Sequence, residues 1–257
     1  MGSETPLKVW TETEGALLRL RLSRPKANLV DAAMIAALRS ALEENLSAPK
    51  LRAVLLDAEG PHFSFGASVQ EHLPGSCAAM LRDLHALIGR LVTSPVPVLA
   101  AVRGQCLGGG LEVAISGHRI FAAPGAAFGQ PEIQLAVFAP AASCLLPERI
   151  GQARAEDLLF SGRSVGAEEA LRIGLVDELA DDPSAAAVAY FDAHLRPRSG
   201  SSLRFAVRAA RAGFADRVLS KLAEVERMYL EELMATHDAV EGLNAFLAKR
   251  PAAWEDR

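Results

Sequence analysis

The spacing of hydrophobic residues predicts both strands and helices in the first two thirds of the chain. In segment 17–22 (LLRLRL), leucines alternate with two arginines, and this period of two indicates a strand with one face toward solvent. The apolar runs at 53–57 and 98–102 are typical of buried strands, and a further strand is expected at 119–123. Helices are expected between these strands, most clearly at 77–92, where apolar residues recur every three or four positions. Alternating strands and helices predict an α/β fold.

After Gly151 the pattern becomes helical. Helices are expected at 153–160, at 167–172 and over a long stretch from about 205 to 247. The chain is therefore predicted to consist of an α/β core over residues 1–195 and a helical C-terminal region over residues 196–257. The long apolar stripes of the last helices indicate oligomerisation.

Composition narrows the class of protein. Half of the 257 residues are hydrophobic and 23% are charged, so the chain has enough apolar surface to build a core without disulfides or metals. A net charge of −4 argues against a nucleic-acid-binding protein held by charge. The three separated cysteines are expected to be free thiols in a reducing compartment. No signal peptide is recognised, and the apolar segment 133–146 is shorter than the ~20 residues of a membrane span, so a cytoplasmic protein without membrane association is expected.

Three consecutive glycines, Gly108–Gly110, open a predicted helix. Such a cluster lets a ligand approach unpaired backbone N–H groups at the positive end of the helix. It also allows tight packing of the helix against the preceding strand, and the residues by themselves leave both readings open. The segment matches neither the Rossmann nor the P-loop spacing.

Two glutamates are the candidate acids of the chain. Glu112 lies about one turn into the glycine-initiated helix, and Glu132 is a lone acid in an apolar stretch that runs to Leu146. Burial there would raise the pKa of Glu132 toward the range useful for proton transfer. Glu112 also fits an ordinary acidic residue near a helix N-terminus, and Glu132 also fits a buried structural carboxylate that is hydrogen-bonded. The histidines show no ligand spacing, so no metal site is expected.

Taken together, these segments resemble a known family. The order FSFGAS at 63–68, GQCLGGGLE at 104–112 and FGQPE at 128–132 is similar to the signature of the crotonase (enoyl-CoA hydratase/isomerase) superfamily. The match continues in LLPERIG at 145–151 and in the C-terminal segment 241–250. It begins at RPKAN, residues 24–28, and so covers nearly the whole chain in the family's order.

The resemblance implies a fold, a substrate class and an assembly. The fold is a crotonase-type spiral of ββα units with a helical C-terminal oligomerisation region, assembled as a homotrimer or a dimer of trimers. The substrate is an acyl-CoA thioester, so coenzyme A belongs to the substrate and no other cofactor is implied. The backbone N–H groups of Ala67 and Gly109 are implied to form an oxyanion hole for the thioester oxygen. The residues implied to contact coenzyme A are Lys26, Ala27, Ser64, Gly66, Phe246 and Lys249.

The family resemblance also gives the two glutamates a role. Hydratases of the family retain both acids, matched here by Glu112 and Glu132, which hold the water, take its proton and protonate carbon. Many relatives with other activities keep one of the acids or neither. A hydro-lyase that adds water to an unsaturated acyl-CoA is therefore expected, with the acid and base assignments left open.

Three departures from the family pattern fall on segments that wall its acyl pocket. Ser68 stands where aspartate is usual, segment 134–143 (QLAVFAPAAS) replaces a glycine-rich stretch, and segment 68–74 (SVQEHLP) differs from the common D-L-x-E-M. The residues expected to line the pocket are Ser68, His72, Val137 and Phe138, although for His72 a structural or solvent role is favoured.

The same departures point to a branch of the family. GASVQEHLP together with the altered segment resembles the cyclohexa-1,5-diene-1-carbonyl-CoA hydratases of anaerobic aromatic degradation, which add water to a conjugated ring. The alternatives are an ordinary 2-enoyl-CoA hydratase of fatty-acid β-oxidation and a non-catalytic crotonase-fold protein that binds RNA or a protein partner. The acidic pI and the retention of both glutamates argue against the last.

Overall fold

Two sheets organise the computed structural model, which describes residues 5–257. The larger sheet has the strand order β1-β2-β3-β4-β6-β9, in which only the β1–β2 pair is antiparallel. Its strands are β1 (Leu7–Glu12), β2 (Leu17–Leu22), β3 (Ala53–Ala58), β4 (Val98–Val102), β6 (Arg119–Ala122) and β9 (Glu178–Leu179). The smaller sheet has the order β5-β7-β8 and comprises β5 (Gln105–Leu107), β7 (Ala127–Gly129) and β8 (Ser164–Gly166).

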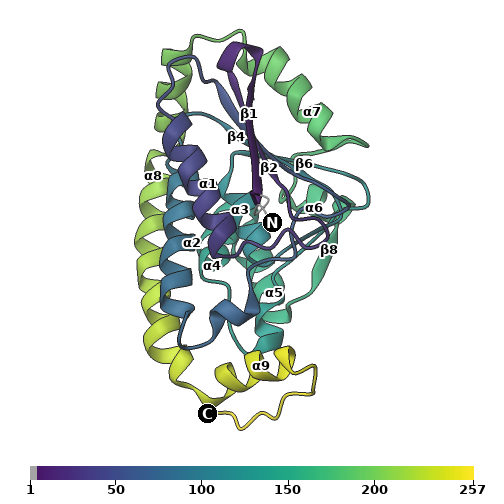
Figure 1. Cartoon of the computed structure of the whole chain (residues 1–257), viewed down its shortest axis with the longest axis vertical. Helices are drawn as coiled ribbons and strands as arrows, with labels where there is room; N and C mark the ends of the chain where they lie inside the picture. Colours follow the sequence, from purple (N-terminus) through teal and green to yellow (C-terminus); the bar gives the residue numbers. More distant parts are fainter. Residues whose placement is uncertain (1–4) are drawn as a thin grey trace.

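The chain repeats one ββα pattern as it winds between the sheets (Figure 1). A strand of the large sheet leads into a short strand of the smaller sheet and then into a helix, as in β4–β5–α3 and β6–β7–α4. The second repeat runs from β3 to the helix at 77–92. A single parallel bridge, Ser64 to Cys106, takes the place of its short strand. The helices that end the repeats are α1 (Ala32–Asn45), α2 (Cys77–Val92), α3 (Gly109–Ser116) and α4 (Pro140–Ile150). The expected spiral of ββα units is confirmed.

The helices cover the two faces of the large sheet unequally. Helices α1 to α4 pack side by side on one face, and the long helix α8 (Gly200–Arg227) lies along α2 and α4 (Figure 1). Leu18, Leu20 and Leu22 of β2 point into this main core. The opposite face carries a smaller core that includes Leu17 and Leu55, covered by α7 (Pro183–Tyr190).

The C-terminal part does not fold apart from the rest. Val218 and Leu222 of α8 and Leu243 of α9 (His237–Leu247) belong to the same hydrophobic core as the strands. The predicted boundary at residue 195 therefore separates two parts of one packed unit. Helices α5 (Gln152–Ser161) and α6 (Ala167–Ile173) complete the fold between them. Across residues 5–257, no helix combines the length and the apolar character needed to cross a bilayer.

Most predicted elements are present, three of them with the predicted ends: strands 17–22 and 98–102 and helix 77–92. The predicted helical stretch from about 205 to 247 is present; it begins earlier, at Gly200, and is divided into two helices. Helix α8 ends at Arg227, a wider turn at Met228–Glu232 and a short 3-10 turn follow, and α9 starts after Thr236, whose hydroxyl accepts the Ala239 N–H. Apolar residues continue through this break, so the hydrophobic period does not reveal it.

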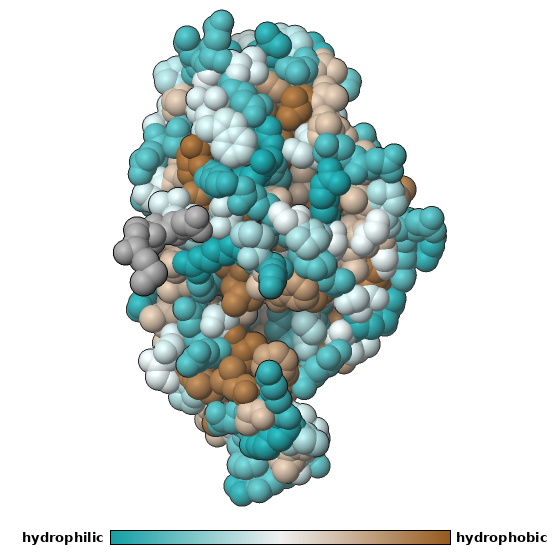
Figure 2. Space-filling view, turned by 45° about the vertical axis from the view of Figure 1, so that its right-hand side comes forward, coloured by the Kyte–Doolittle hydropathy of each residue, from teal (hydrophilic) through white to brown (hydrophobic). Residues whose placement is uncertain are grey.

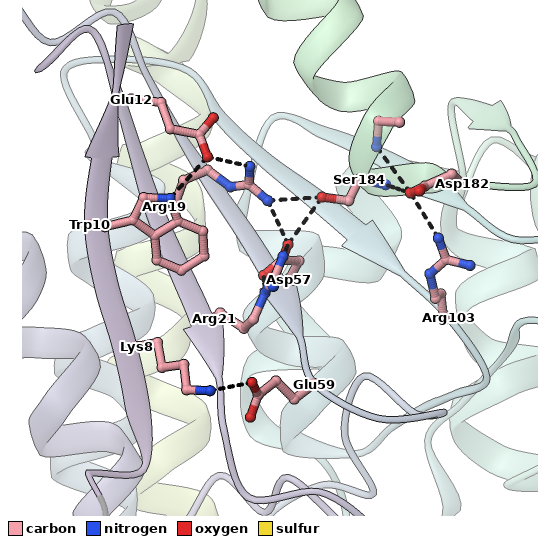
Figure 3. Close-up of polar contacts among 11 residues, drawn as sticks. Lys8, Trp10, Glu12, Arg19, Arg21, Asp57, Glu59, Arg103, Asp182 and Ser184 are labelled. Atoms are coloured by element: carbon pink, nitrogen blue, oxygen red, sulfur yellow. Dashed lines mark hydrogen bonds and ion pairs between the residues drawn. The ribbon is translucent and has the colours of Figure 1, made fainter. Parts of the chain in front are cut away.

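The expected solvent-facing side of β2 is also wrong, because Arg19 is only 5% exposed. Its guanidinium donates to Asp57 at 2.7 Å and to Glu12 at 2.9 Å, and Arg21 donates to the same Asp57 at 2.6 Å. Figure 3 shows this cluster between β1, β2 and β3, with Ser184 reaching Asp57 from α7. Ion pairing and the cover of α7 let these polar groups lie on a buried sheet face.

Burial by itself raises the pKa of Asp57, but the guanidinium groups of Arg21 and Arg19 outweigh it and hold that pKa below its ordinary value. Asp57 therefore stabilises the fold above the pKa of an unfolded aspartate, about 3.9, and this contribution is lost as the pH falls through the lower folded value. We expect Asp57→Asn to lower the free energy of unfolding by about 3 kcal/mol at neutral pH, since it leaves the buried Arg19 without one of its two carboxylate partners. Urea denaturation measures the change.

Asp157→Asn is the matched control, because Asp157 pairs with Arg163 at the exposed surface, where solvent screening leaves such a pair little effect on stability. An equal loss of unfolding free energy in the two variants would contradict a structural role for the buried cluster of Arg19, Arg21 and Asp57.

Candidate active site

The site begins where two glycine-containing loops press together. Ser64 pairs with Cys106, and Gly66 has φ of +101°. A side chain at Gly66 would place its Cβ 3.1 Å from the Leu107 carbonyl oxygen and 3.5 Å from the Gly109 nitrogen. The left-handed backbone and the close approach both require glycine at this position.

This approach brings two backbone amides side by side. A Cβ at Gly109, the first residue of α3, would lie 3.2 Å from the Ala67 nitrogen. Within residues 5–257, no protein acceptor takes the N–H of Ala67 or of Gly109. Two free donors, one of them at a helix N-terminus, form a suitable site for an oxygen that gains negative charge.

Glu112 lies one turn further along α3 and is only 3% exposed. Its carboxyl accepts the Ala142 N–H at 2.8 Å, at the start of α4. Burial raises the pKa of Glu112 to about 7, although the N–H groups of Ala142 and Ala141 act in the opposite direction. Near neutral pH this carboxyl is therefore poised between its two protonation states.

Glu132 follows β7 in a short 3-10 turn, Pro131–Leu135. The pairing of Leu107 with Gly129 brings this turn to the glycine cluster, where a Cβ at Gly108 would lie 2.7 Å from Glu132 Oε1. Burial, together with the neighbouring charge of Glu112, raises the pKa of Glu132 to about 8. The two carboxyls therefore titrate as an interacting pair that holds about one proton near pH 7.5.

Gln130 adds a hydrogen-bond donor beside this pair. With its amide nitrogen toward Glu132, it donates to both carboxyl oxygens, at 3.0 and 3.1 Å. No lysine or arginine side chain bonds either glutamate within the described residues. The pair is thus hydrogen-bonded but not neutralised by a cation, as proton transfer near neutral pH requires.

A small cavity of about 80 Å³ lies between these groups. Both glutamates, Ala67 and Gly109 line it, and the rest of its wall is mainly apolar. His72, Val137 and Phe138, three of the residues expected at the acyl pocket, lie in this wall. Ser68 does not; its carbonyl instead accepts a hydrogen bond from His72 Nδ1 at 2.8 Å.

Sequence reasoning missed several groups that complete the cavity. Leu81 and Leu84 of α2 and Leu243 of α9 line it, although the stripe of α2 indicated only a core-facing helix. The Ala142 N–H that bonds Glu112 carries no sequence signal, because any residue except proline supplies the same donor.

The residues expected to contact coenzyme A fall into two groups. The Ala27 carbonyl accepts the Phe65 N–H at 2.9 Å, which brings Lys26 and Ala27 beside the loop of Ser64 and Gly66. The Ser64 side chain is buried and accepts the Gly66 N–H, so it faces the protein interior. Phe246 and Lys249 lie at the end of α9, where both are exposed.

Hydrophobic surface gathers around a hollow just above the C-terminal helices, in the lower half of Figure 2. Phe65, which lines the cavity, is 44% exposed, so apolar surface continues from the cavity to the outside. No cluster of three or more His, Cys, Asp or Glu side chains in the described part of the chain is arranged to hold a metal ion.

Comparison with known proteins agrees with this geometry. A sequence model of the enoyl-CoA hydratase/isomerase family matches residues 12–257. The cyclohexa-1,5-dienecarbonyl-CoA hydratase of Thauera aromatica is 68% identical over 255 residues, which cover 99% of both chains. A probable enoyl-CoA hydratase of Mycobacterium leprae is 34% identical over 93% of this chain and 94% of its own.

Solved structures give the same result for the fold. An enoyl-CoA hydratase/isomerase from Pseudoalteromonas atlantica superposes with a TM-score of 0.85 at 27% identity, covering 97% of this chain and 99% of its own. An enoyl-CoA hydratase from Mycobacterium avium superposes with a TM-score of 0.86 at 25% identity, over 97% and 98%. The resemblance seen in the sequence motifs is confirmed: the chain belongs to the enoyl-CoA hydratase/isomerase family.

Proposed function

We propose that this protein is a hydratase that adds water to cyclohexa-1,5-diene-1-carbonyl-CoA and forms 6-hydroxycyclohex-1-ene-1-carbonyl-CoA. The observation that carries the proposal is a pair of carboxyls, those of buried Glu112 and half-buried Glu132, beside the two free amides of Ala67 and Gly109 in one compact apolar cavity. The 68% identity to a hydratase of this ring diene supports the choice of substrate.

The amides act on the thioester oxygen. Attack of water at the ring carbon next to the acyl-bearing carbon moves electrons toward that oxygen and gives a dienolate. The N–H groups of Ala67 and Gly109 stabilise this charge more than they stabilise the uncharged carbonyl, and so lower the barrier.

The carboxyl pair moves the protons. The ionised carboxyl takes one proton from water as the new C–O bond forms. The protonated carboxyl gives its proton to the far end of the diene, and the two ring double bonds become one. Because a pair with pKa values near 7 and 8 holds about one proton, it supplies both the base and the acid. The addition of water changes no overall oxidation state, so the proposal requires no redox cofactor, and coenzyme A enters as part of the substrate.

We expect kcat/KM to show a bell-shaped pH dependence. The rate falls as the pH drops through about 7, because the base becomes protonated, and falls again as the pH rises through about 8, because the acid loses its proton. Initial rates between pH 5 and 10 in buffers of constant ionic strength measure the profile. A flat profile over this range would contradict the paired role.

Glu112→Gln and Glu132→Gln should each reduce turnover about 10²-fold or more while the far-ultraviolet circular dichroism spectrum is unchanged. The limb of the pH profile that each variant loses identifies its glutamate as base or acid. Glu148→Gln is the control, because Glu148 lies at the surface and pairs with Arg217. Near-normal turnover in either active-site variant would remove that residue from the mechanism.

An ordinary 2-enoyl-CoA hydratase is the second candidate, favoured by the match of probable enoyl-CoA hydratases to 93% of the chain. Incubation of the purified protein with cyclohexa-1,5-diene-1-carbonyl-CoA or with crotonyl-CoA, followed by mass spectrometry, separates the two. We expect the mass of one water to be gained by the ring ester alone. Hydration of crotonyl-CoA alone would establish the straight-chain activity instead.

We also propose that the protein acts in the cytoplasm and assembles as a homotrimer or a dimer of trimers. In this assembly Phe246 and Lys249 contact the coenzyme A that is bound to a neighbouring subunit. Large apolar side chains that one chain leaves exposed support assembly, among them Phe160 at 72% and Phe205 at 63%. Sedimentation equilibrium measures the number of chains.

A further inference from the structure

One polar side chain of the cavity has no part in the mechanism above. Of the side chains that line the cavity among residues 5–257, only those of Glu112, Glu132 and His72 are polar. His72 ends the short 3-10 turn Val69–His72, on the loop that continues from Ala67. A polar group in an otherwise apolar wall needs a partner when a ligand displaces water from the cavity.

The hydrogen bonding of His72 determines what it offers to a ligand. Nδ1 lies 2.8 Å from the Ser68 carbonyl oxygen, which can only accept, so Nδ1 carries the proton. Burial lowers the pKa of His72, so the imidazole is neutral near pH 7. Nε2 then has a lone pair and no proton, and no protein group of the described chain bonds it. The turn therefore presents a fixed hydrogen-bond acceptor.

The chemistry of a ring diene creates a need for such an acceptor. When water is added across two adjacent carbons, both carboxyls can stay close to that water. In the 1,4-addition proposed here, one carboxyl delivers its proton to the ring carbon opposite the attacked one. That carboxyl is then less able to hold the hydrogen that stays on the added oxygen, which needs another acceptor in the apolar cavity.

We propose that His72 is a specificity-determining residue that accepts, at Nε2, the hydrogen bond of the hydroxyl group that hydration places on the ring. The proposal rests on the function proposed above. His72 takes no proton in this role; it orients the added oxygen and distinguishes a ring that bears a hydroxyl from one that does not. Ser68 departs from the family pattern in its side chain, but its backbone carbonyl is the group that contacts His72. This carbonyl holds the imidazole in the required tautomer.

Binding measurements test this without relying on turnover. Two CoA esters, 6-hydroxycyclohex-1-ene-1-carbonyl-CoA and cyclohex-1-ene-1-carbonyl-CoA, differ only in the hydroxyl. We expect His72→Met to weaken binding of the hydroxylated ester about tenfold and to leave the other unchanged, as loss of one hydrogen bond predicts. His72→Gln, whose side-chain oxygen is also an acceptor, should restore part of the difference. His194→Met, at an exposed histidine outside the cavity, is the control.

Equal weakening for both esters would overturn the proposal, because it would mean that His72 only shapes the loop. Unchanged binding of the hydroxylated ester would overturn it as well, because another group would then hold the hydroxyl. Failure of the proposed function is distinguishable: the wild-type protein would then leave cyclohexa-1,5-diene-1-carbonyl-CoA unhydrated whatever the variants bind.

Discussion

The close approach of two backbones, at Gly66 and at Gly108–Gly110, is the constraint on which the site depends. A Cβ at Gly110 would lie 2.5 Å from the Cβ of Ser64, so no larger residue fits without moving the loops apart. This contact places the Ala67 and Gly109 amides together, and it also sets where α3 begins. Because Glu112 lies one turn into α3, the same contact positions an acid of the pair relative to the amides. One steric condition therefore aligns both halves of the proposed chemistry.

Buried carboxyls behave in opposite ways at two places in this protein. Asp57 is buried between Arg19 and Arg21, which outweigh the desolvation and hold its pKa low. In the described part of the chain Glu112 and Glu132 have no such cation, so burial raises their pKa values to about 7 and 8. The first arrangement keeps a permanent charge that ties strands to α7, whereas the second keeps a proton that can be exchanged near neutral pH. The counter-ion, rather than burial alone, separates a structural acid from a candidate catalytic one.

The cavity combines backbone donors with side chains from segments that depart from the family's motif pattern. The amides and the Ala142 N–H are main-chain donors, so segment 134–143 can change its side chains and still bond Glu112. In the same segment, Val137 and Phe138 form apolar wall, and Ala136 adopts a left-handed conformation with φ of +54° where the 3-10 turn ends. His72 adds the polar exception. A scaffold of this kind can keep its oxyanion site while the acyl-binding wall varies.

Local pattern alone determined much of the architecture. The periods of residues 77–92 and 98–102 predicted a helix and a strand with the observed ends, because burial on one face imposes them within a few turns of chain. The glycine cluster and the two glutamates were found by motif order. Tertiary structure alone decided that Arg19 is buried, that α8 and α9 are separate helices, and that Leu243 meets Glu112 in one cavity. It also decided the protonation of the pair and the tautomer of His72. These properties depend on distances and desolvation between residues remote in the sequence, which no local pattern encodes.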